Sequence, residues 1–390
     1  MRKLLAMCCA LCLSLSCKPS QGRVDRISEN GVEVVLNRLE PYVLRGEPSI
    51  LTLERVLSID TEKDSTAAQG VTEIFSFDVD SAGNIYVLTP PTGPGNRVFK
   101  FSAKGEFITS FGRMGQGPNE LEYPHQILAV DPDKIWVLES PKNKYHVFVN
   151  DGAPAGENIA KPGFEDLIPL ENGGFLITRL LTDDMKAKYL PLVLRLTDSK
   201  FQVIKELDRS NTRPNRLIAE SLPEKIVCGT EFVFLAKTGG GRIYAGNGER
   251  GYEILVYDLE GKLIRKIRKE YSPVPVSDEY KKNYMKPYEE YMPEYAKKIY
   301  FPENWHAFRS FFVDDDGRLF VMTYEPGEDP GESMFDIFNN DGVFFMRTSL
   351  NILCLGPSTI LARTKGNRLY CVQEKTGGYK ELVVYKMVWK

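Results

Sequence analysis

The sequence predicts an all-β fold, a six-bladed β-propeller with four-stranded antiparallel blades. Three observations predict it. A short unit, an acidic or polar turn followed by an apolar strand, recurs six times along the chain. Each copy is followed by two more apolar runs joined by a turn, which is a hairpin signal. Such units stack around an axis as blades, because one unit alone cannot bury both of its faces.

The copies of this unit divide most of the chain. They lie at residues 80–88, 131–138, 171–177, 240–245, 314–321 and 365–372. Measured between one reference residue in each copy, the copies are 50, 40, 68, 76 and 49 residues apart. The reference residues are 83, 133, 173, 241, 317 and 366. A propeller blade takes ~40–50 residues. The two longer spacings therefore predict insertions in two connections.

A strand ahead of the first copy is expected to close the ring. Residues 49–59 alternate in the manner of a strand, whereas the sixth copy ends with the chain at Lys390. We expect residues 49–59 to become the outer strand of the last blade, since a closed ring leaves only short edges. The predicted propeller domain is therefore 49–390.

The first residues resemble an export signal. Arg2 and Lys3 precede an apolar run, Leu4 to Leu15, that is shorter than the ~20 residues of a membrane span. Ser16 and Cys17 follow, so residues 1–16 resemble the signal peptide of a bacterial lipoprotein, in which Cys17 would receive the lipid. Residues 17–48 would be the lipid-attachment tether and lead-in. The alternative is a soluble export signal, because Leu13 and Ser14 depart from the usual lipoprotein pattern.

Charge and cysteine content narrow the function classes. Lys+Arg 50 against Asp+Glu 53 gives no basic excess, so no nucleic-acid partner is expected. Beyond the signal peptide and Cys17, the chain has three cysteines: Cys228, Cys354 and Cys371. Three thiols do not make a disulfide framework, and two readings stay open: buried free thiols, or a Cys354–Cys371 bridge.

One loop carries a resemblance to a known family. Gly112-Arg-Met-Gly-Gln-Gly-Pro-Asn-Glu-Leu121, with Tyr123-Pro124 after it, resembles the Gly-rich run that joins the blades of NHL-repeat propellers. The chain thus resembles the six-bladed NHL-like β-propeller lipoproteins of bacteria, which implies the fold but hardly any activity. The loop's glycines and prolines have a sufficient structural role. A functional role would place Arg113, Gln116 and Asn119 on a ligand-facing rim.

Some six-bladed propellers are enzymes, and their metal sites were sought in this sequence. The resemblance to zinc-dependent lyases would require about three imidazoles, yet the chain has only His125, His146 and His306. His146 lies in an outer-type strand. The resemblance to calcium-dependent lactonases needs six or so oxygen ligands. The densest acidic run, 314–316, belongs to the repeated turn, and is expected to be solvated. No catalytic residue, metal ligand or cofactor is therefore predicted, although calcium stays open.

The longest insertion is predicted to be helical. Over about residues 278–300, tyrosines recur at steps of three and four residues, which places them on one helix face. Asp278 is the expected N-cap, and Pro287 and Pro293 are expected to kink or divide the helix. The Tyr face would either pack on the propeller flank or form a wall beside the mouth of the central channel, where it would suit a sugar or peptide.

The segment after this insertion enters an inner strand. Its residues Trp305, His306 and Arg309 are therefore candidate ligand-binding residues at the channel mouth. His125, which enters the second blade's inner strand, is their counterpart.

These observations favour a binding protein over an enzyme. The predicted function is an exported, lipid-anchored propeller in the cell envelope, on the periplasmic or outer-surface side, that acts as a binding or scaffold module. Its partners would be the membrane, through the anchor, and a protein, peptide or glycan. The alternative is a metal-dependent, lactonase-like hydrolase or lyase with its site in the central channel. A third reading, a structural lipoprotein, predicts a channel plugged by Phe and Leu.

Overall fold

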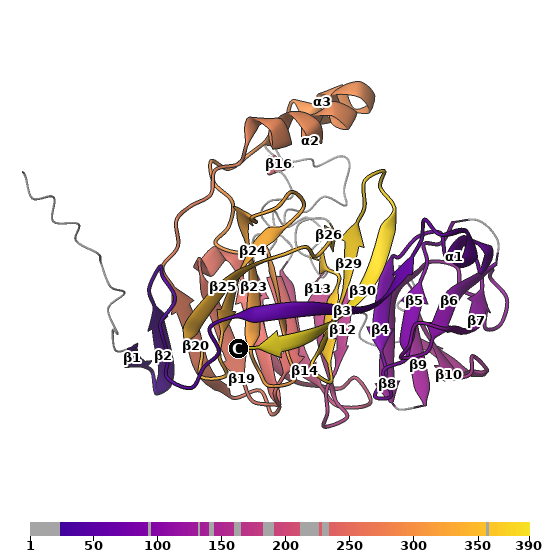
Figure 1. The fold of residues 1–390 in the computed structure, drawn as a ribbon, viewed down its shortest axis with the longest axis horizontal. Coiled ribbons are helices and arrows are strands. Elements are labelled where there is room, and N and C mark those ends of the chain that lie inside the picture. The colour runs from indigo at the N-terminus through magenta and orange to yellow at the C-terminus, as the bar shows by residue number, and fades with distance from the viewer. Residues whose placement is uncertain are drawn as a thin grey trace, which may run out of the picture.

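Six antiparallel sheets follow one another along the chain and surround a common axis (Figure 1). The computed structural model describes residues 24–92, 95–131, 133–139, 144–159, 165–181, 191–210, 226–227, 234–355 and 359–390. The predicted signal peptide, Cys17 and Cys228 lie outside these residues. The six-bladed propeller of four-stranded antiparallel blades is confirmed.

In each blade the first strand is innermost and the fourth is outermost. Blade 1 contains β4 (Ser76–Val79), β5 (Ile85–Leu88), β6 (Asn96–Phe101) and β7 (Phe107–Arg113). Blade 2 contains β8 (Pro124–Asp131), β9 (Lys134–Glu139), β10 (Lys144–Val149) and β11 (Pro154–Ile159). Blade 3 contains β12 (Asp166–Pro169), β13 (Phe175–Leu180), β14 (Leu192–Thr197) and β15 (Val203–Ser210).

The second half of the ring repeats this order. Blade 4 contains β17 (Phe234–Gly239), β18 (Arg242–Asn247), β19 (Glu253–Tyr257) and β20 (Leu263–Lys269), with a 3₁₀ turn, η3 (Gly248–Arg250). Blade 5 contains β22 (Ser310–Val313), β23 (Leu319–Pro326), β24 (Ser333–Phe338) and β25 (Phe344–Leu350). Blade 6 contains β28 (Ala362–Lys365), β29 (Arg368–Glu374) and β30 (Lys380–Trp389).

The fourth strand of blade 6 comes from the start of the chain, as predicted. β3 (Leu51–Asp60) pairs antiparallel with β30, from Leu51 opposite Trp389 to Asp60 opposite Glu381. Short elements lie between the blades: α1 (Asp64–Ala68), β16 (Ile226–Val227), which pairs in parallel with β21 (Ile299–Tyr300), and β26 (Cys354–Leu355), which pairs with β27 (Thr359–Ile360).

The repeated acidic residue shapes the turn between the first two strands of a blade. In blade 1, the Asp80 carboxylate accepts hydrogen bonds from the backbone N–H groups of Ala82 and Asn84, at 3.0 and 2.9 Å. In blade 5, the Asp314 carboxylate accepts hydrogen bonds from the backbone N–H groups of Asp316 and Arg318. Asp314 is buried, whereas the sequence predicted a solvated side chain. The side chain thus supplies the hydrogen bonds that the reversing backbone needs.

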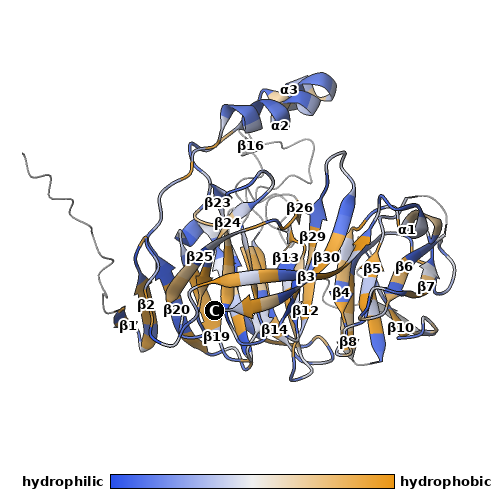
Figure 2. Ribbon diagram, viewed as in Figure 1, coloured by the Kyte–Doolittle hydropathy of each residue, from blue (hydrophilic) through white to orange (hydrophobic). Residues whose placement is uncertain are grey.

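Apolar side chains fill the six interfaces between neighbouring blades. The strands of the blades accordingly carry many hydrophobic residues, which alternate with hydrophilic stretches (Figure 2). Each interface has its own buried cluster, represented by Phe111 and Phe148 (blades 1 and 2), Leu138 and Phe175 (2 and 3), Leu194 and Ile243 (3 and 4), Val256 and Phe311 (4 and 5), Phe335 and Leu369 (5 and 6), and Val384 and Phe77 (6 and 1). Cys354 and Cys371 are buried free thiols in the cluster between blades 5 and 6.

An N-terminal hairpin widens blade 4. β1 (Asp25–Glu29) and β2 (Val32–Asn37) are joined at Asn30 and Gly31, whose φ values of 52° and 80° suit a two-residue hairpin turn. β2 pairs in parallel with β20, the outer strand of blade 4. Residues 17–48, expected to be tether and lead-in, therefore contain a hairpin that joins the propeller.

The segment between the hairpin and β3 crosses to the last blade. The Asn37 amide donates to the carbonyls of Arg268 and Gly342, and its oxygen accepts from Phe344 N–H at 2.8 Å. Tyr42 N–H donates to Phe344 O, and Ser49 N–H donates to Lys390 O. Residues 37–49 therefore tie the outer edges of blades 4, 5 and 6 together.

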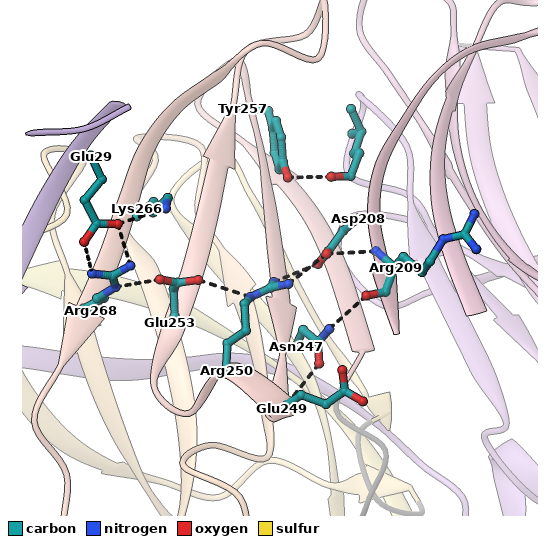
Figure 3. A network of polar contacts seen from close by, with 11 residues as sticks. Glu29, Asp208, Arg209, Asn247, Glu249, Arg250, Glu253, Tyr257, Lys266 and Arg268 are labelled. Atoms are coloured by element: carbon teal, nitrogen blue, oxygen red, sulfur yellow. Dashed lines mark hydrogen bonds and ion pairs between the residues drawn. The ribbon is translucent and has the colours of Figure 1, made fainter. Parts of the chain in front are cut away.

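A network of charges holds the hairpin to its neighbours (Figure 3). Arg268 lies between Glu29 of β1 and Glu253 of β19, with closest contacts of 2.5 and 2.6 Å. Arg250 continues the row, with contacts of 3.2 Å to Glu253 and 2.7 Å to Asp208 of blade 3. The alternating signs link the hairpin, blade 4 and blade 3.

This network predicts a pH dependence of stability. Hydrogen bonds from Arg268 and Lys266 lower the pKa of Glu29 to about 2, from 4.5. The stability that ionised Glu29 contributes is therefore complete above about pH 4.5 and is lost as the pH falls toward 2. We expect Glu29→Gln to have a lower melting temperature than the wild type at pH 7, with a gap that narrows between pH 4.5 and 3 in thermal scans.

The control for this prediction is Glu260→Gln, which removes an exposed carboxylate from a turn of the same blade. Its melting temperature should follow the wild type throughout. A Glu29→Gln gap that widens on acidification would contradict the assignment.

Candidate functional site

Polar side chains of the inner strands meet at the axis. Asp78, Lys237 and Arg363 occupy equivalent positions of β4, β17 and β28, since each lies opposite a tyrosine of the next strand. Gln126 and Asp166, of β8 and β12, lie near them. All five side chains are only partly buried, so solvent reaches them. The third reading predicted an axis filled by Phe and Leu. At these five positions that prediction is wrong, because the residues are polar.

The polar groups around the axis, which we name the axial cluster, come from five blades, and hydrogen bonds join four of these blades. It consists of Asp78, Gln126, Asp166, Lys237 and Arg363. Gln126 Nε2 donates to Asp166 Oδ1 at 2.8 Å, and Arg363 Nε donates to Asp78 Oδ1 at 3.3 Å. Asp78 Oδ2 also accepts from the backbone of Ala129. These hydrogen bonds satisfy much of the carboxylates' capacity to accept.

Lys237 is the exception in this cluster. In the described part of the chain, its ammonium has neither a hydrogen bond nor a carboxylate within ion-pair distance. Burial lowers the pKa of Lys237, and the charge of Arg363 lowers it further, while Asp166 and Cys354 act in the opposite direction. Among the described residues, Lys237 is thus a basic group at the axis without a direct counter-ion.

The helical insertion between β20 and β22 carries a row of aromatic rings. Its base is closed by backbone hydrogen bonds from Val276 to Glu303 and from Trp305 to Val274. Trp305 stacks on Tyr324 of β23, with ring centroids 4.5 Å apart and planes 10° apart. Tyr280 meets Trp305 edge-on at 4.7 Å. We name this group the aromatic row; its further members are Tyr284, Tyr288 and Tyr295.

The helices that carry the row stand above the blades (Figure 1). α2 (Asp278–Tyr291) has no buried residue, and both α2 and α3 (Pro293–Ala296) are mostly hydrophilic (Figure 2). The predicted insertion is confirmed, but Ser277 caps α2 in place of Asp278. The chain divides at Met292, because a residue before proline is driven out of the helical region. Pro287 does not divide α2, which continues past it.

The aromatic row and the axial cluster are neighbours. The Arg309 guanidinium donates to the carbonyl of Cys354 at 3.2 Å. Burial raises the pKa of the Cys354 thiol, while the charges of Arg309 and Lys237 lower it. Burial also raises the pKa of Tyr324, against the charge of Arg309. Arg309 therefore contacts Cys354 and acts electrostatically on Tyr324, and Lys237 acts electrostatically on Cys354.

Three buried polar atoms of blades 2 and 5 have no hydrogen-bond partner among the described residues. They are Tyr324 Oη, His125 Nδ1 and Gln126 Oε1. Burial lowers the pKa of His125, while Asp166, Glu165 and Glu139 raise it. Buried polar groups are normally paired with protein or with ordered water, so such atoms around one axis are suited to hydrogen bonds with a ligand or with water.

The predicted site residues fall into two groups. Trp305 stacks on Tyr324, Arg309 donates to Cys354, and His125 lies at the start of β8. His306 is a partly buried residue between Trp305 and β22. Arg113 is the last residue of β7, and Gln116 and Asn119 lie in the loop after it. Gln116 donates to Glu122 at 2.8 Å, and Asn119 has a φ of 61°. Their assignment as ligand-binding residues stays a prediction.

Glu139 connects that loop to His146. It accepts hydrogen bonds from the backbone N–H groups of Glu122 and Tyr123, and it contacts His146 at 2.9 Å. His146 is buried in β10, the third strand of blade 2. Within the described residues, no group of three or more His, Cys, Asp or Glu side chains is arranged to hold a metal ion.

A cavity lies at the other end of the axis. Its volume is about 360 Å³, and its walls include Leu170, Thr238, Val313, Asp314 and Thr364 from blades 3 to 6. None of the residues singled out from the sequence as binding residues lines it. Asp314 there is engaged by Arg318 and by its own turn.

Comparisons with known proteins support the fold. A family model described as 6-bladed beta-propeller matches residues 50–207. A solved structure from Bacteroides fragilis, whose name describes it as an exported protein, covers 92% of this chain and 99% of its own, with 12% identity and a TM-score of 0.52. A member of the DUF4221 family from Bacteroides vulgatus covers 88% and 99%, with 11% identity and a TM-score of 0.48. No curated protein matches the sequence.

The described helices were also tested as membrane spans. None of those in the described ranges is both long and apolar enough to cross a bilayer.

The unpaired hydroxyl of Tyr324 leads to a stability prediction. Tyr324→Phe removes an unpaired polar atom and keeps the stack on Trp305, so the free energy of unfolding should not fall. The matched control is Tyr252→Phe, because Tyr252 donates to buried Asp336 at 2.7 Å. That variant should lose about 1–3 kcal/mol in urea unfolding. A loss at Tyr324 as large as at Tyr252 would contradict the absence of a partner.

Proposed function

We propose that the protein is an exported, lipid-anchored propeller that binds a saccharide where the aromatic row meets the axial cluster. The observation that carries the proposal is the stack of Trp305 on Tyr324, whose buried hydroxyl has no hydrogen-bond partner among the described residues. Rigid aromatic rings give a ligand broad contact at low entropic cost. A few fixed polar groups then orient it.

The mixture of polar groups favours a saccharide over a peptide. The region offers a hydroxyl that can donate, Tyr324 Oη, and an acceptor, Gln126 Oε1. A sugar hydroxyl both donates and accepts, so a ligand rich in hydroxyl groups can satisfy both kinds. Peptide recognition more often adds a strand to an exposed sheet edge, and the first strands of the blades lie at the axis. A peptide ligand is therefore an outcome of the test.

The test is a binding screen of the full chain. We expect it to retain members of a saccharide array and not those of a peptide array presented on the same surface. Trp305→Ala should weaken the strongest saccharide by about 10-fold or more in calorimetry, because aromatic anchors carry much of a binding energy. Phe107→Ala, which removes a half-exposed ring from an outer strand, should bind as the wild type. Retention of peptides alone, or unchanged binding by Trp305→Ala, would refute the proposal.

We extend the proposal to location, on the evidence of the sequence. The Ser16-Cys17 boundary is typical of lipid attachment, and the Bacteroides fragilis protein of the same fold is also described as exported. The loop at 112–124 supports a relation to the NHL-like lipoproteins. A lipid-attached Cys17 would hold the propeller at a membrane surface, since acyl chains partition into the bilayer.

Cys17→Ala tests the anchor. In a bacterial host fed an alkyne fatty acid, the wild-type chain should incorporate the label and sediment with membranes. The Cys17→Ala variant should lose the label and leave the membrane fraction. Cys12→Ala, a change within the same signal, should behave as the wild type. Labelling that survives Cys17→Ala would exclude this residue as the attachment site.

A further inference from the structure

Lys237 has no function in the fold that its surroundings reveal. It lies in the inner strand of blade 4, opposite Tyr244 of the next strand. Inner-strand lysines that stabilise a propeller would be expected to pair with a carboxylate across the axis, since an unpaired ammonium is costly to desolvate. In the described part of this chain no carboxylate lies within 4 Å of it.

The nearby carboxylates are already engaged. Asp78 accepts from Arg363 and from Ala129 N–H, and Asp166 accepts from Gln126 and from Leu167 N–H. Asp166 still acts electrostatically on Lys237, but Arg363 acts in the opposite direction. Arg309 adds a further positive charge near Cys354, which Lys237 also approaches. Within the described residues, no carboxylate is therefore left to pair with Lys237 and neutralise its positive charge.

An anionic group on a ligand would complete this arrangement. A ligand carboxylate or sulfate would give the ammonium a charge-assisted hydrogen bond, which is about twice as strong as a neutral one. Trp305 stacks on Tyr324, and Arg309, four residues after Trp305, donates to Cys354, on which Lys237 acts electrostatically. Such a ligand would carry its charge to the axis while its ring lies against the aromatic row.

We infer that Lys237 binds the anionic substituent of an acidic saccharide, a uronate carboxylate or a sugar sulfate. This inference rests on the proposed saccharide-binding function and adds the charge of the ligand to it. Lys237 is the specificity-determining residue, and Trp305 is the general contact.

The test compares matched ligands on the full chain. The probes are trigalacturonate with its carboxyl-reduced counterpart galactotriose, a hyaluronan tetrasaccharide with its carboxyl-reduced form, and a sulfated galactan oligosaccharide with its desulfated form. We expect at least one charged probe to bind about 10-fold or more tightly than its uncharged counterpart. The carboxylate and sulfate pairs identify which anion the site accepts.

The variants assign the preference to Lys237. Lys237→Met should bring the ratio of the two dissociation constants close to one while affinity for the uncharged form stays within threefold. Lys237→Arg should keep a preference for the charged form. Lys200→Met, which removes an exposed lysine from a blade 3 turn, should behave as the wild type. Because the ammonium lacks a partner, Lys237→Met should melt no lower than the wild type, which verifies that it folds.

Each contrary outcome has a distinct meaning. If charged and uncharged forms bind equally and Trp305→Ala weakens both, saccharide binding stands and the function of Lys237 is refuted. If the preference survives in Lys237→Met, another cation provides it and the inference fails. If no charged probe binds in any pair, the inference fails as well, and the array screen decides separately whether saccharides bind at all.

Discussion

Burial of apolar surface between neighbouring blades is the interaction on which the structure depends. Each blade has two apolar faces, and each of the six interfaces contains its own cluster of buried side chains. A linear stack would leave two faces in water, so the blades must close into a ring. The pairing of β3 with β30 provides the closure, because it makes the last blade from both ends of the chain.

The outer edge of the ring is fastened a second time by the N-terminal segment. β2 lies along β20, Asn37 bridges blades 4 and 5, and Ser49 reaches Lys390 of blade 6. The charges of Figure 3 extend this attachment to blade 3. Because the outer edges and the interfaces hold the ring, the inner strands are free to carry charged residues such as Lys237, which a core position would not tolerate.

The candidate site combines residues that are far apart in the sequence. His125, Asp166, Lys237 and Arg363 come from the inner strands of four blades, and Arg309 precedes the inner strand of a fifth. The aromatic row comes from an insertion whose base is closed by Trp305 and Val274. The arrangement separates two tasks: a constant ring determines where groups meet, and one insertion and a few inner-strand substitutions determine what they bind.

The sequence by itself determined the repeated turn, the hairpins, the number of blades, the closing strand and the helical insertion, because each depends on local periodicity and turn chemistry. Asn30-Gly31 is also typical of a two-residue hairpin turn, so the N-terminal hairpin could have been predicted from the sequence. Only the tertiary structure decided that Lys237, Asp166 and Arg363 share an axis with Trp305 and Tyr324. Each of these residues lies in a different strand or loop, and its neighbours across the ring depend on blade order and register, which no local pattern encodes.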